Sequence, residues 1–492
     1  MEIKLIGALD YNKVKDIIGK YVEDDTLINS IVSEIKDVEI ARHSEVVSAA
    51  GRLSRFPGNV NEVLKKSESF SLEKNSNFAN RVISMGHKSI TDHDYLLFSL
   101  EDVSVILEHI LICERFASFT IKSRREVDFR SVGYYVPDFH DVNGNIIDNN
   151  NELKTKYKNH MDKLFNRYGE YVDKGISKED ARFILPYSFY SNIIMGIDAH
   201  TLLDMIIKFT KTKYAKIKEV NELGNKLYEI ASIYTPYLIP YIDLVPVNYN
   251  DSVDEYLAGK IERENYKILD RVKLLNSSDN IDDTILASAI ARRYEYDYDK
   301  SLDLYKKVFD NDDIKLEFMK HIAFDSDKLE LSQVNFTFQI PVSFAVLTHF
   351  ERHRTYKFLL DDFTHVDSMQ YKKPPRIKEE DYSSSFIDSN NIKDLFKKYG
   401  VRDEDLIYFT LAGNMTNIVA NMDGWTVRHI LELRECTKAQ WETRAIAYGM
   451  HKEIDNLKHA KIYSKILGST CMTQGICNEG KESCGKIKLF LK

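Results

Sequence analysis

The sequence has 492 residues, of which 43% are hydrophobic and 29% are charged, and its formal net charge is −8. These values indicate a globular chain that is long enough for two hydrophobic cores. The negative balance argues against non-specific nucleic-acid binding, so an anionic ligand needs a local cluster of cations. No window is apolar and long enough to cross a membrane, and the N-terminal segment lacks the apolar core of a signal peptide.

An internal repeat is the most informative feature of the sequence. The segment SAAGR at 48–52 recurs as SAIAR at 288–292, an offset of 240. Arg115 matches Arg354 at an offset of 239, and a late helix from Asp198 matches one from Asp423 at an offset of 225. Because the offsets drift slowly and stay in order, we interpret the chain as an ancient tandem duplication.

The duplication predicts two similar α+β domains, each a small, mostly antiparallel sheet with flanking helices, arranged as a pseudo-dimer. Prolines at 236, 240 and 246 end a helical run and indicate the boundary. A polar helix at 254–275 is predicted to join the halves. The predicted division is a first half at 1–246, a linker or helical connector at 247–280, a second half at 281–468 and a cysteine-containing tail at 469–492.

Each half is predicted to have its elements in the same order. A helix at 41–52 in the first half corresponds to one at 283–293 in the second. A strand follows in each half, and the one at 334–340 alternates apolar and polar residues as a half-buried strand requires. Its partner is predicted at 95–100. A helix, a polar loop and a long pair of helices then complete each half, with the serines at 383–385 in loop structure.

Basic residues follow the apolar helix in both halves. Arg352, His353 and Arg354 lie at the predicted C-terminal end of the second-half helix, where cations are stabilised. Arginine also offers a planar fork to phosphate and to heterocycles, although a solvated helix end explains the same residues. The first half has a damaged copy around Arg115. Beyond it lies a stretch that fits either a phosphate cradle or a solvated basic loop: Lys122, Ser123, Arg124 and Arg125.

Two further segments carry polar groups. Asp423 is predicted to cap a helix on which Arg434, Lys438 and Trp441 share one face, through i, i+4 and i+7 spacing. This face would suit an anionic aromatic ligand, and a surface helix with one buried Trp is the alternative. The GHKS turn at 86–89 fits either a ligand-contacting turn or an ordinary pair of helix caps.

Taken together, these residues resemble the flavin-dependent thymidylate synthases, whose signature is Arg-His-Arg followed by a serine and an arginine in a short loop. The second half matches Arg-His-Arg at 352–354. The first half matches the remainder at Arg115, Ser118, Ser123 and Arg125 but has Cys113-Glu114 where Arg-His is expected. The GHKS turn resembles the family's flavin-contacting turn. ARFILP at 181–186 is similar to its Ala-Arg-x-x-Leu-Pro element, and AQWE at 439–442 to the end of its active-site helix.

The resemblance implies reductive methylation of dUMP to dTMP. Methylenetetrahydrofolate supplies the carbon, and a hydride from NAD(P)H passes through FAD. Arg434 is the implied catalytic residue, and Lys438 stands where the family has a histidine. The implied dUMP ligands are Arg352, Lys122, Ser123, Arg124, Arg125 and Arg182. The implied FAD ligands are Ser89, Arg115, Arg352, His353, Arg354, Asp423, His429 and Lys438.

The resemblance also implies an assembly, because the family's pocket is shared between the subunits of a tetramer. One half is expected to donate Arg352 and Arg434 while the other donates Ser123 and Arg125, in a homodimer that forms a pseudo-tetramer. The expected partners are small-molecule substrates, with neither nucleic acid nor membrane. Two alternatives stay open, which are an inactive flavin- or nucleotide-binding homologue and a ligand-free scaffold protein.

The cysteines give a weaker signal. Five cysteines in so long a chain do not make a disulfide framework, which fits a reducing, cytoplasmic location. Cys471, Cys477 and Cys484 lie in the tail, with His459 upstream, but their spacing matches no recognised zinc motif. We therefore predict no metal, with a site at these three cysteines as the alternative to free thiols.

Overall fold

The computed structural model describes residues 1–249, 252–262, 267–360 and 363–489 and divides into two compact units. Unit 1 comprises Met1–Glu170, Pro186–Glu264 and Asn391–Phe409. Unit 2 comprises Tyr171–Leu185, Asn265–Asn390 and Thr410–Lys492. Each unit therefore includes a short segment from the other half of the sequence. The contiguous boundaries predicted at 246, 280 and 468 stay a prediction.

Unit 1 contains the elements of the first half and a short piece of the second. They are β1 (Glu2–Leu5), α1 (Tyr11–Ile18), α2 (Asp25–Leu53), α3 (Val60–Glu68), α4 (Leu72–Ser84), η1 (Lys88–His93), β2 (Tyr95–Ser104), α5 (Val105–Ile112), β3 (Ala117–Ile121), α6 (Asn150–Asp173, ending in unit 2), β4 (Tyr190–Asp198), α8 (Ala199–Lys211), η3 (Lys213–Lys216), α9 (Lys218–Tyr234), η4 (Pro236–Leu238), α10 (Ile239–Leu244), α11 (Ser252–Leu257), α17 (Asp403–Leu406) and η7 (Ile407–Phe409).

Unit 2 repeats this order with its own elements. They are α7 (Lys178–Ala181), η2 (Arg182–Ile184), β5 (Lys273–Ser277), α12 (Ile281–Tyr294), α13 (Tyr298–Val308), α14 (Asp312–Phe324), η5 (Leu329–Gln333), β6 (Asn335–Ser343), α15 (Phe344–Glu351), β7 (Lys357–Leu359), η6 (Phe363–His365), α16 (Glu379–Lys398, ending in unit 1), β8 (Met415–Asp423), α18 (Gly424–Arg434), α19 (Trp441–Asp455), η8 (Lys458–Ala460), α20 (Lys461–Ser464), α21 (Thr470–Thr473), η9 (Gly480–Glu482) and η10 (Lys486–Leu489).

The two units contain the same antiparallel sheet. The strand order is β1-β2-β4-β3 in unit 1 and β5-β6-β8-β7 in unit 2. The register also repeats, because Tyr95 pairs with Asp198 in one sheet and Asn335 pairs with Asp423 in the other. Both aspartates then cap the helix that follows, accepting hydrogen bonds from Thr201 N and Thr426 N. The predicted α+β class and the similarity of the two domains are confirmed.

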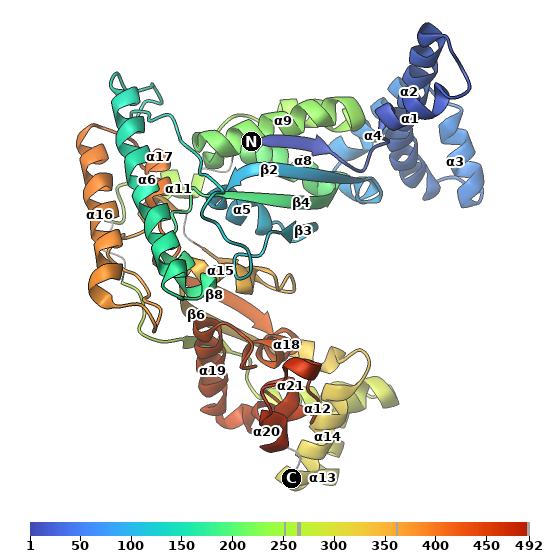
Figure 1. Cartoon of the computed structure of the whole chain (residues 1–492). Coiled ribbons are helices and arrows are strands. Elements are labelled where there is room, and N and C mark those ends of the chain that lie inside the picture. The colour runs from blue at the N-terminus through green and yellow to red at the C-terminus, as the bar shows by residue number, and fades with distance from the viewer. Residues whose placement is uncertain (250–251, 263–266, 361–362, 490–492) are drawn as a thin grey trace. The chain divides into compact units, whose positions relative to one another are not determined.

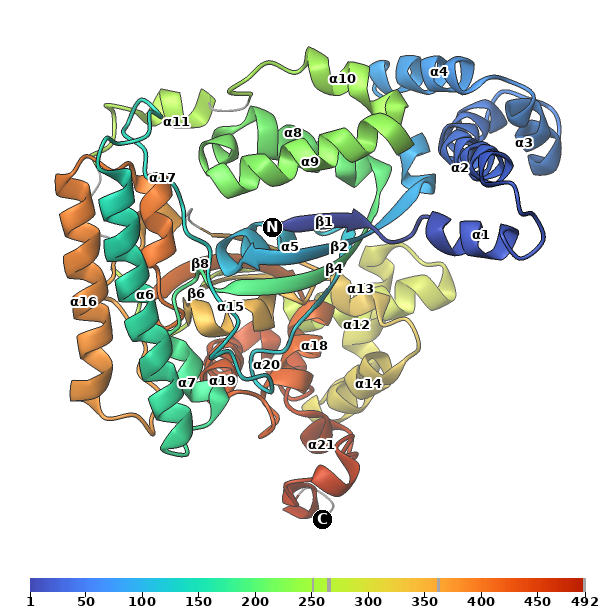
Figure 2. The same ribbon diagram turned by 45° about the horizontal axis from the view of Figure 1, so that its top comes forward.

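The central strands bury one face against helices. In β6 the side chains of Phe336, Phe338 and Ile340 are fully buried, while the residues between them are half-buried, as the alternating pattern predicts. In unit 1, α8 and α9 lie together beside the sheet, and α2, α3 and α4 form a separate group of helices (Figure 1; Figure 2). That helical group carries the pocket described below.

Several sequence-based predictions of local structure are wrong. The segment predicted as a helix at 254–275 contains the start of β5, an edge strand paired with β6; its residues 263–266 lie outside the described residues. The serines at 383–385 lie inside α16 rather than in a loop. The strands β4 and β8 precede α8 and α18, where a simple pair of helices is predicted. Among the described residues, no helix combines the length and apolar character that a membrane span needs.

Candidate functional site

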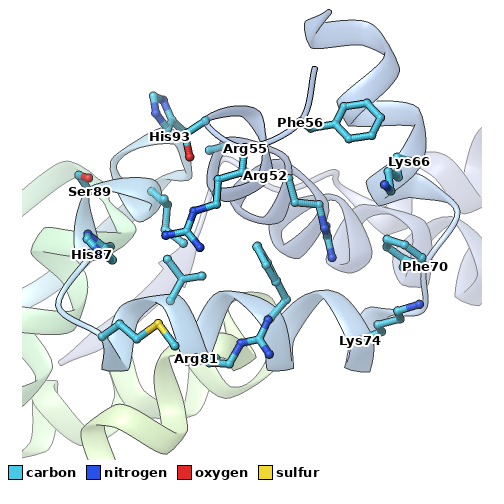
Figure 3. Close-up of a pocket in the computed structure, with 17 residues that line it drawn as sticks. Arg52, Arg55, Phe56, Lys66, Phe70, Lys74, Arg81, His87, Ser89 and His93 are labelled. Carbon is cyan, nitrogen blue, oxygen red and sulfur yellow. The ribbon is translucent and has the colours of Figure 1, made fainter. Parts of the chain in front are cut away.

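A pocket of about 800 Å³ lies among α2, α3, α4 and η1 of unit 1 (Figure 3). Seven of its lining residues carry a cationic or imidazole group, namely Arg52, Arg55, Lys66, Lys74, Arg81, His87 and His93. Among the described residues that line the pocket, none is Asp or Glu. The pocket therefore has a positive potential, which attracts anions.

Arg52 is held in this pocket by both neighbouring helices. Its Nη1 donates hydrogen bonds to Ser67 Oγ at 2.9 Å and to Asn75 Oδ1 at 3.0 Å. Its guanidinium carbon lies 4.8 Å from the ring centroid of Phe70 and 4.3 Å from that of Phe78. A guanidinium fixed between aromatic rings is preorganised to bind phosphate or a flat heterocycle.

The GHKS turn joins α4 to this pocket. Gly86 has a φ of +91°, a left-handed conformation that favours glycine. After the turn, the exposed side chains of His87 and Ser89 line the pocket, whereas Lys88 Nζ lies 3.2 Å from Asp204 Oδ1. Ser89, a predicted FAD ligand, is thus part of the cationic pocket.

The other basic stretch of unit 1 follows β3. Lys122 and Arg125 are exposed, and Ser123 Oγ accepts a hydrogen bond from Arg125 N at 3.4 Å. Arg124 differs, because its guanidinium is buried and forms an ion pair with the fully buried Glu108 of α5. Arg115 is half-buried in the turn between α5 and β3.

Unit 2 brings together three of the predicted site residues at the ends of α15 and α18. Arg434 Nε donates a hydrogen bond to His353 Nε2 at 3.2 Å, and its Nη2 donates to the carbonyl oxygen of His349 at 3.0 Å. The ring of His353 packs edge-on against His429 with centroids 5.6 Å apart. His429 in turn stacks on Trp425 at 5.3 Å. We call Arg434, His353, His429 and Trp425 the arginine–histidine cluster.

Burial determines the charge of the imidazoles in this cluster. Burial, reinforced by Arg434 and His429, lowers the pKa of His353 to about 3. Burial also lowers the pKa of His429. Both imidazoles are therefore neutral at neutral pH, and the unprotonated Nε2 of His353 accepts the hydrogen bond from Arg434.

The other predicted residues of unit 2 lie around the cluster. The prediction that basic residues follow the helix end is confirmed, because α15 ends at Glu351, Arg352 is its C-cap, and Arg352 and Arg354 are exposed. The prediction that Arg434, Lys438 and Trp441 share one helical face is wrong. The helix is broken there, with α18 ending at Arg434 and α19 beginning at Trp441. Lys438 lies in the intervening loop and pairs with Glu482 at 3.0 Å.

Two buried glutamates occupy corresponding positions in the two repeats, and the sequence patterns did not identify the structural role of either. Glu442 of α19 accepts hydrogen bonds from Ser343 N at 2.8 Å and Ser343 Oγ at 2.7 Å, at the end of β6. Glu219 of α9 accepts the same pair from Ser104 at the end of β2. Glu442 belongs to the AQWE segment of the resemblance, and the alignment of that segment with the first repeat is the signal that could have revealed Glu219.

Each of these glutamates interacts with the short segment that its unit takes from the other half of the sequence, Asn391–Phe409 in unit 1 and Tyr171–Leu185 in unit 2. In unit 1, Tyr408 Oη donates a hydrogen bond to Glu219 at 3.1 Å. In unit 2, the buried Arg182 is close enough to help lower the pKa of Glu442, although burial raises that pKa overall. Arg182 and Tyr408 occupy corresponding positions in the two repeats, and each interacts with the buried glutamate of its own unit.

The family model described as "Thymidylate synthase complementing protein" matches this chain twice, at residues 38–237 and 273–457. The chain belongs to this family. Its two matched segments correspond to the two repeats, so the tandem arrangement is confirmed.

Relatives in this family are similar to about one repeat of the chain. The flavin-dependent thymidylate synthase of Clostridium tetani is 28% identical over 237 residues, which cover 46% of this chain and 93% of that protein. The enzyme of the same name from Pyrococcus horikoshii is 28% identical and covers 42% and 90%. The one from Pyrococcus furiosus is 33% identical over 126 residues, covering 25% and 49%.

A solved structure, the UMP/dUMP methylase of Streptomyces cacaoi bound with 5-Br dUMP, is also similar. It is 17% identical and covers 42% of this chain and 92% of that chain, with a TM-score of 0.36.

The cysteine tail lies beyond both segments that match the family. Cys471, Cys477 and Cys484 line one small cavity in unit 2, and Cys436 of the α18–α19 loop joins them there. No group of three or more His, Cys, Asp or Glu side chains in the described part of the chain is arranged to hold a metal ion. Cys436, Cys471, Cys477 and Cys484 are free thiols.

Proposed function

We propose that this protein is a flavin-dependent thymidylate synthase that converts dUMP to dTMP in the cytoplasm. The methylene carbon of methylenetetrahydrofolate, a hydride from NAD(P)H and one proton convert the C5–H of uracil to a C5–methyl group and leave tetrahydrofolate. The observation that carries the proposal is the arginine–histidine cluster, which lies in a segment matched by the family and sets a fixed guanidinium beside two neutral imidazoles.

Arg434 is the proposed catalytic residue. It would stabilise the negative charge that develops across the N3–O4 edge of uracil. Its hydrogen bonds to His353 and to the carbonyl of His349 orient the guanidinium before substrate arrives. A charged donor that is already oriented in a site without water contributes about 3 kcal/mol to stabilising a transition state.

The nucleotide is proposed to bind cations from both halves of the sequence. Lys122, Ser123 and Arg125 would hold its phosphate, because a half-buried hydroxyl and two exposed cations suit a dianion. Arg352 and Arg182 are the further proposed dUMP ligands. Arg124 has a buried partner in Glu108, so within this set we assign it the role of positioning the loop.

FAD is supported as the cofactor by the cationic pocket of unit 1, whose volume and charge suit a molecule with two phosphates and flat rings. When bound, FAD would carry the hydride from NAD(P)H to the one-carbon unit that becomes the methyl group. Ser89 is the proposed ligand within the pocket. The other proposed FAD ligands are Arg115, Arg352, His353, Arg354, Asp423, His429 and Lys438.

The resemblance also supports an assembly in which halves complete each other's sites. We propose a homodimer, equivalent to a tetramer of single-repeat subunits. Light scattering after size exclusion should give twice the chain mass, and a monomer that retains full activity would reject this assembly.

An inactive flavin- or nucleotide-binding homologue is the second candidate. The observation that favours it is Glu114. In the first half this carboxylate occupies the position of the histidine in the family's Arg-His-Arg signature. Glu114 Oε1 is paired with Lys208 Nζ at 2.5 Å, so that position holds a structural ion pair.

Rescue of a thymidine-requiring bacterial strain by this chain tests the proposal. Growth without thymidine is the expected result. No growth, from a chain that purifies yellow with a flavin spectrum, would identify the inactive binder, and a colourless chain without growth would favour the ligand-free scaffold.

A further inference from the structure

The two repeats differ in charge at the place where unit 1 has its cationic pocket. In unit 1, α2 ends at the cationic pocket, and the GHKS turn after α4 adds an imidazole and a hydroxyl to it. The equivalent helix of unit 2 is α12, and the segment directly after α14 reads Asp325-Ser326-Asp327. The same turn therefore carries carboxylates in unit 2.

These carboxylates bind the arginines at the end of α12. Arg292, the repeat partner of Arg52, pairs with Asp327, and its Nη1 lies 3.2 Å from Glu330 Oε1. Arg293 Nη1 lies 2.6 Å from the same oxygen of Glu330, and its Nη2 pairs with Asp325. Glu330 is only 2% exposed, so both arginines converge on a buried anion.

The charge balance is opposite in the two units. In unit 1 the lining of the pocket brings five Lys and Arg side chains together, and no Asp or Glu stands among its described lining residues. In unit 2 three carboxylates surround two guanidinium groups, which leaves a net negative charge. A phosphate approaching unit 2 would meet repulsion and would have to displace bonds that are already made.

We propose that, of these two equivalent places, only the one in unit 1 is a functional anion pocket, and that Asp325, Asp327 and Glu330 form a built-in anion that closes the other. The inference deepens the proposed function, on which it rests for the identity of FAD. It gives one flavin per chain, although the chain contains two repeats.

Two matched arginine variants test the inference on the full-length protein. Arg81 is exposed in the unit 1 pocket, and Arg292 is bound by carboxylates in unit 2. Equilibrium dialysis with FAD should give one equivalent per chain for the wild type. Arg81→Ser should weaken binding roughly tenfold without changing thermal stability, since one charge-assisted contact is lost. Arg292→Ser should lower the unfolding temperature and leave both the affinity and the single equivalent unchanged.

Inorganic pyrophosphate, measured by calorimetry, separates this inference from the proposed function. A pyrophosphate equivalent that is lost in Arg81→Ser but kept in Arg292→Ser, together with no FAD binding, would support the anion pocket of unit 1 and reject the flavin. Two FAD equivalents per chain, or a second pyrophosphate equivalent that is lost in Arg292→Ser, would overturn the inference while leaving the thymidylate synthase proposal intact. Binding that depends on Arg292 rather than Arg81, or no binding of either probe, would also overturn it.

Discussion

The contact between Arg434 and His353 couples a cation to an imidazole that stays neutral. The neighbouring guanidinium opposes protonation of the ring, and burial opposes it more strongly. The neutral ring can then accept a hydrogen bond from Arg434 Nε, which a protonated imidazole could not do. The charge state of His353 therefore maintains the orientation of the proposed catalytic arginine.

Arg434→Ala should slow turnover severely, because the guanidinium that would stabilise charge on uracil is removed. A loss of roughly 10²- to 10³-fold in kcat is expected for one oriented donor. FAD should remain bound, as judged by its absorbance. Arg376→Ala, which truncates an exposed arginine of the same unit, should retain activity. Unchanged kcat in Arg434→Ala would end the assignment of this role.

The depressed pKa of His353 predicts a pH dependence of stability. The unfolded histidine titrates near 6.5 and the folded one near 3, so the unfolded state binds more protons between these values. Stability should accordingly fall as the pH decreases below about 6.5. Between pH 7 and pH 5 the free energy of unfolding should drop by about 2 kcal/mol more in the wild type than in His353→Gln.

Urea unfolding at the two pH values measures this difference. Taking the difference against His353→Gln cancels the contribution of other groups such as His451, whose pKa is raised by Glu435 and Asp455 despite burial and which acts in the opposite direction. Equal pH dependence in the two proteins would show that His353 titrates normally in the folded state.

The buried glutamates join elements within each repeat. Glu442 fixes the end of β6 to the first turn of α19, and Glu219 does the same for β2 and α9. Burial raises the pKa of Glu219 to about 7, and hydrogen bonds from Ser104 and Tyr408 oppose this rise. Such a carboxylate is retained because it satisfies a buried backbone N–H and a buried hydroxyl.

Glu442→Ala should destabilise the protein by about 3 kcal/mol, because Ser343 N and Oγ would be left without acceptors and a cavity would form. Glu442→Gln keeps an acceptor and the volume, so its cost should be smaller. Thermal unfolding monitored by circular dichroism compares the two. If both variants unfold at the same temperature as the wild type, the contact has no structural importance.

The element scale also shows what the sequence could predict. The alternation in β6 and the cap at Asp423 were predicted because they depend on local residues. The break between α18 and α19 was not predicted. The N-cap of α19 is Gln440, an uncommon capping residue, whose side chain accepts hydrogen bonds from Glu442 N and Thr443 N. The edge strand β5 was missed since its stability comes from pairing with the distant β6.

At the scale of the whole molecule, duplication preserved the fold and let the sites diverge. Strand order and register repeat, while the anion pocket of unit 1 has carboxylates as its counterpart in unit 2. The resemblance indicated Arg434, His353 and His429 of the arginine–histidine cluster. It could not predict the pocket cations Lys66, Lys74 and Arg81, because they belong to separate helices that only the fold brings together.

Formation of dTMP by the purified protein tests the central claim most directly. The chain would be incubated with dUMP, FAD, NADPH and methylenetetrahydrofolate labelled in its methylene carbon, and the nucleotides would be separated and counted. We predict that the label appears in dTMP and that omitting either NADPH or FAD prevents its appearance. A preparation that binds both dUMP and FAD but forms no labelled dTMP would contradict the account.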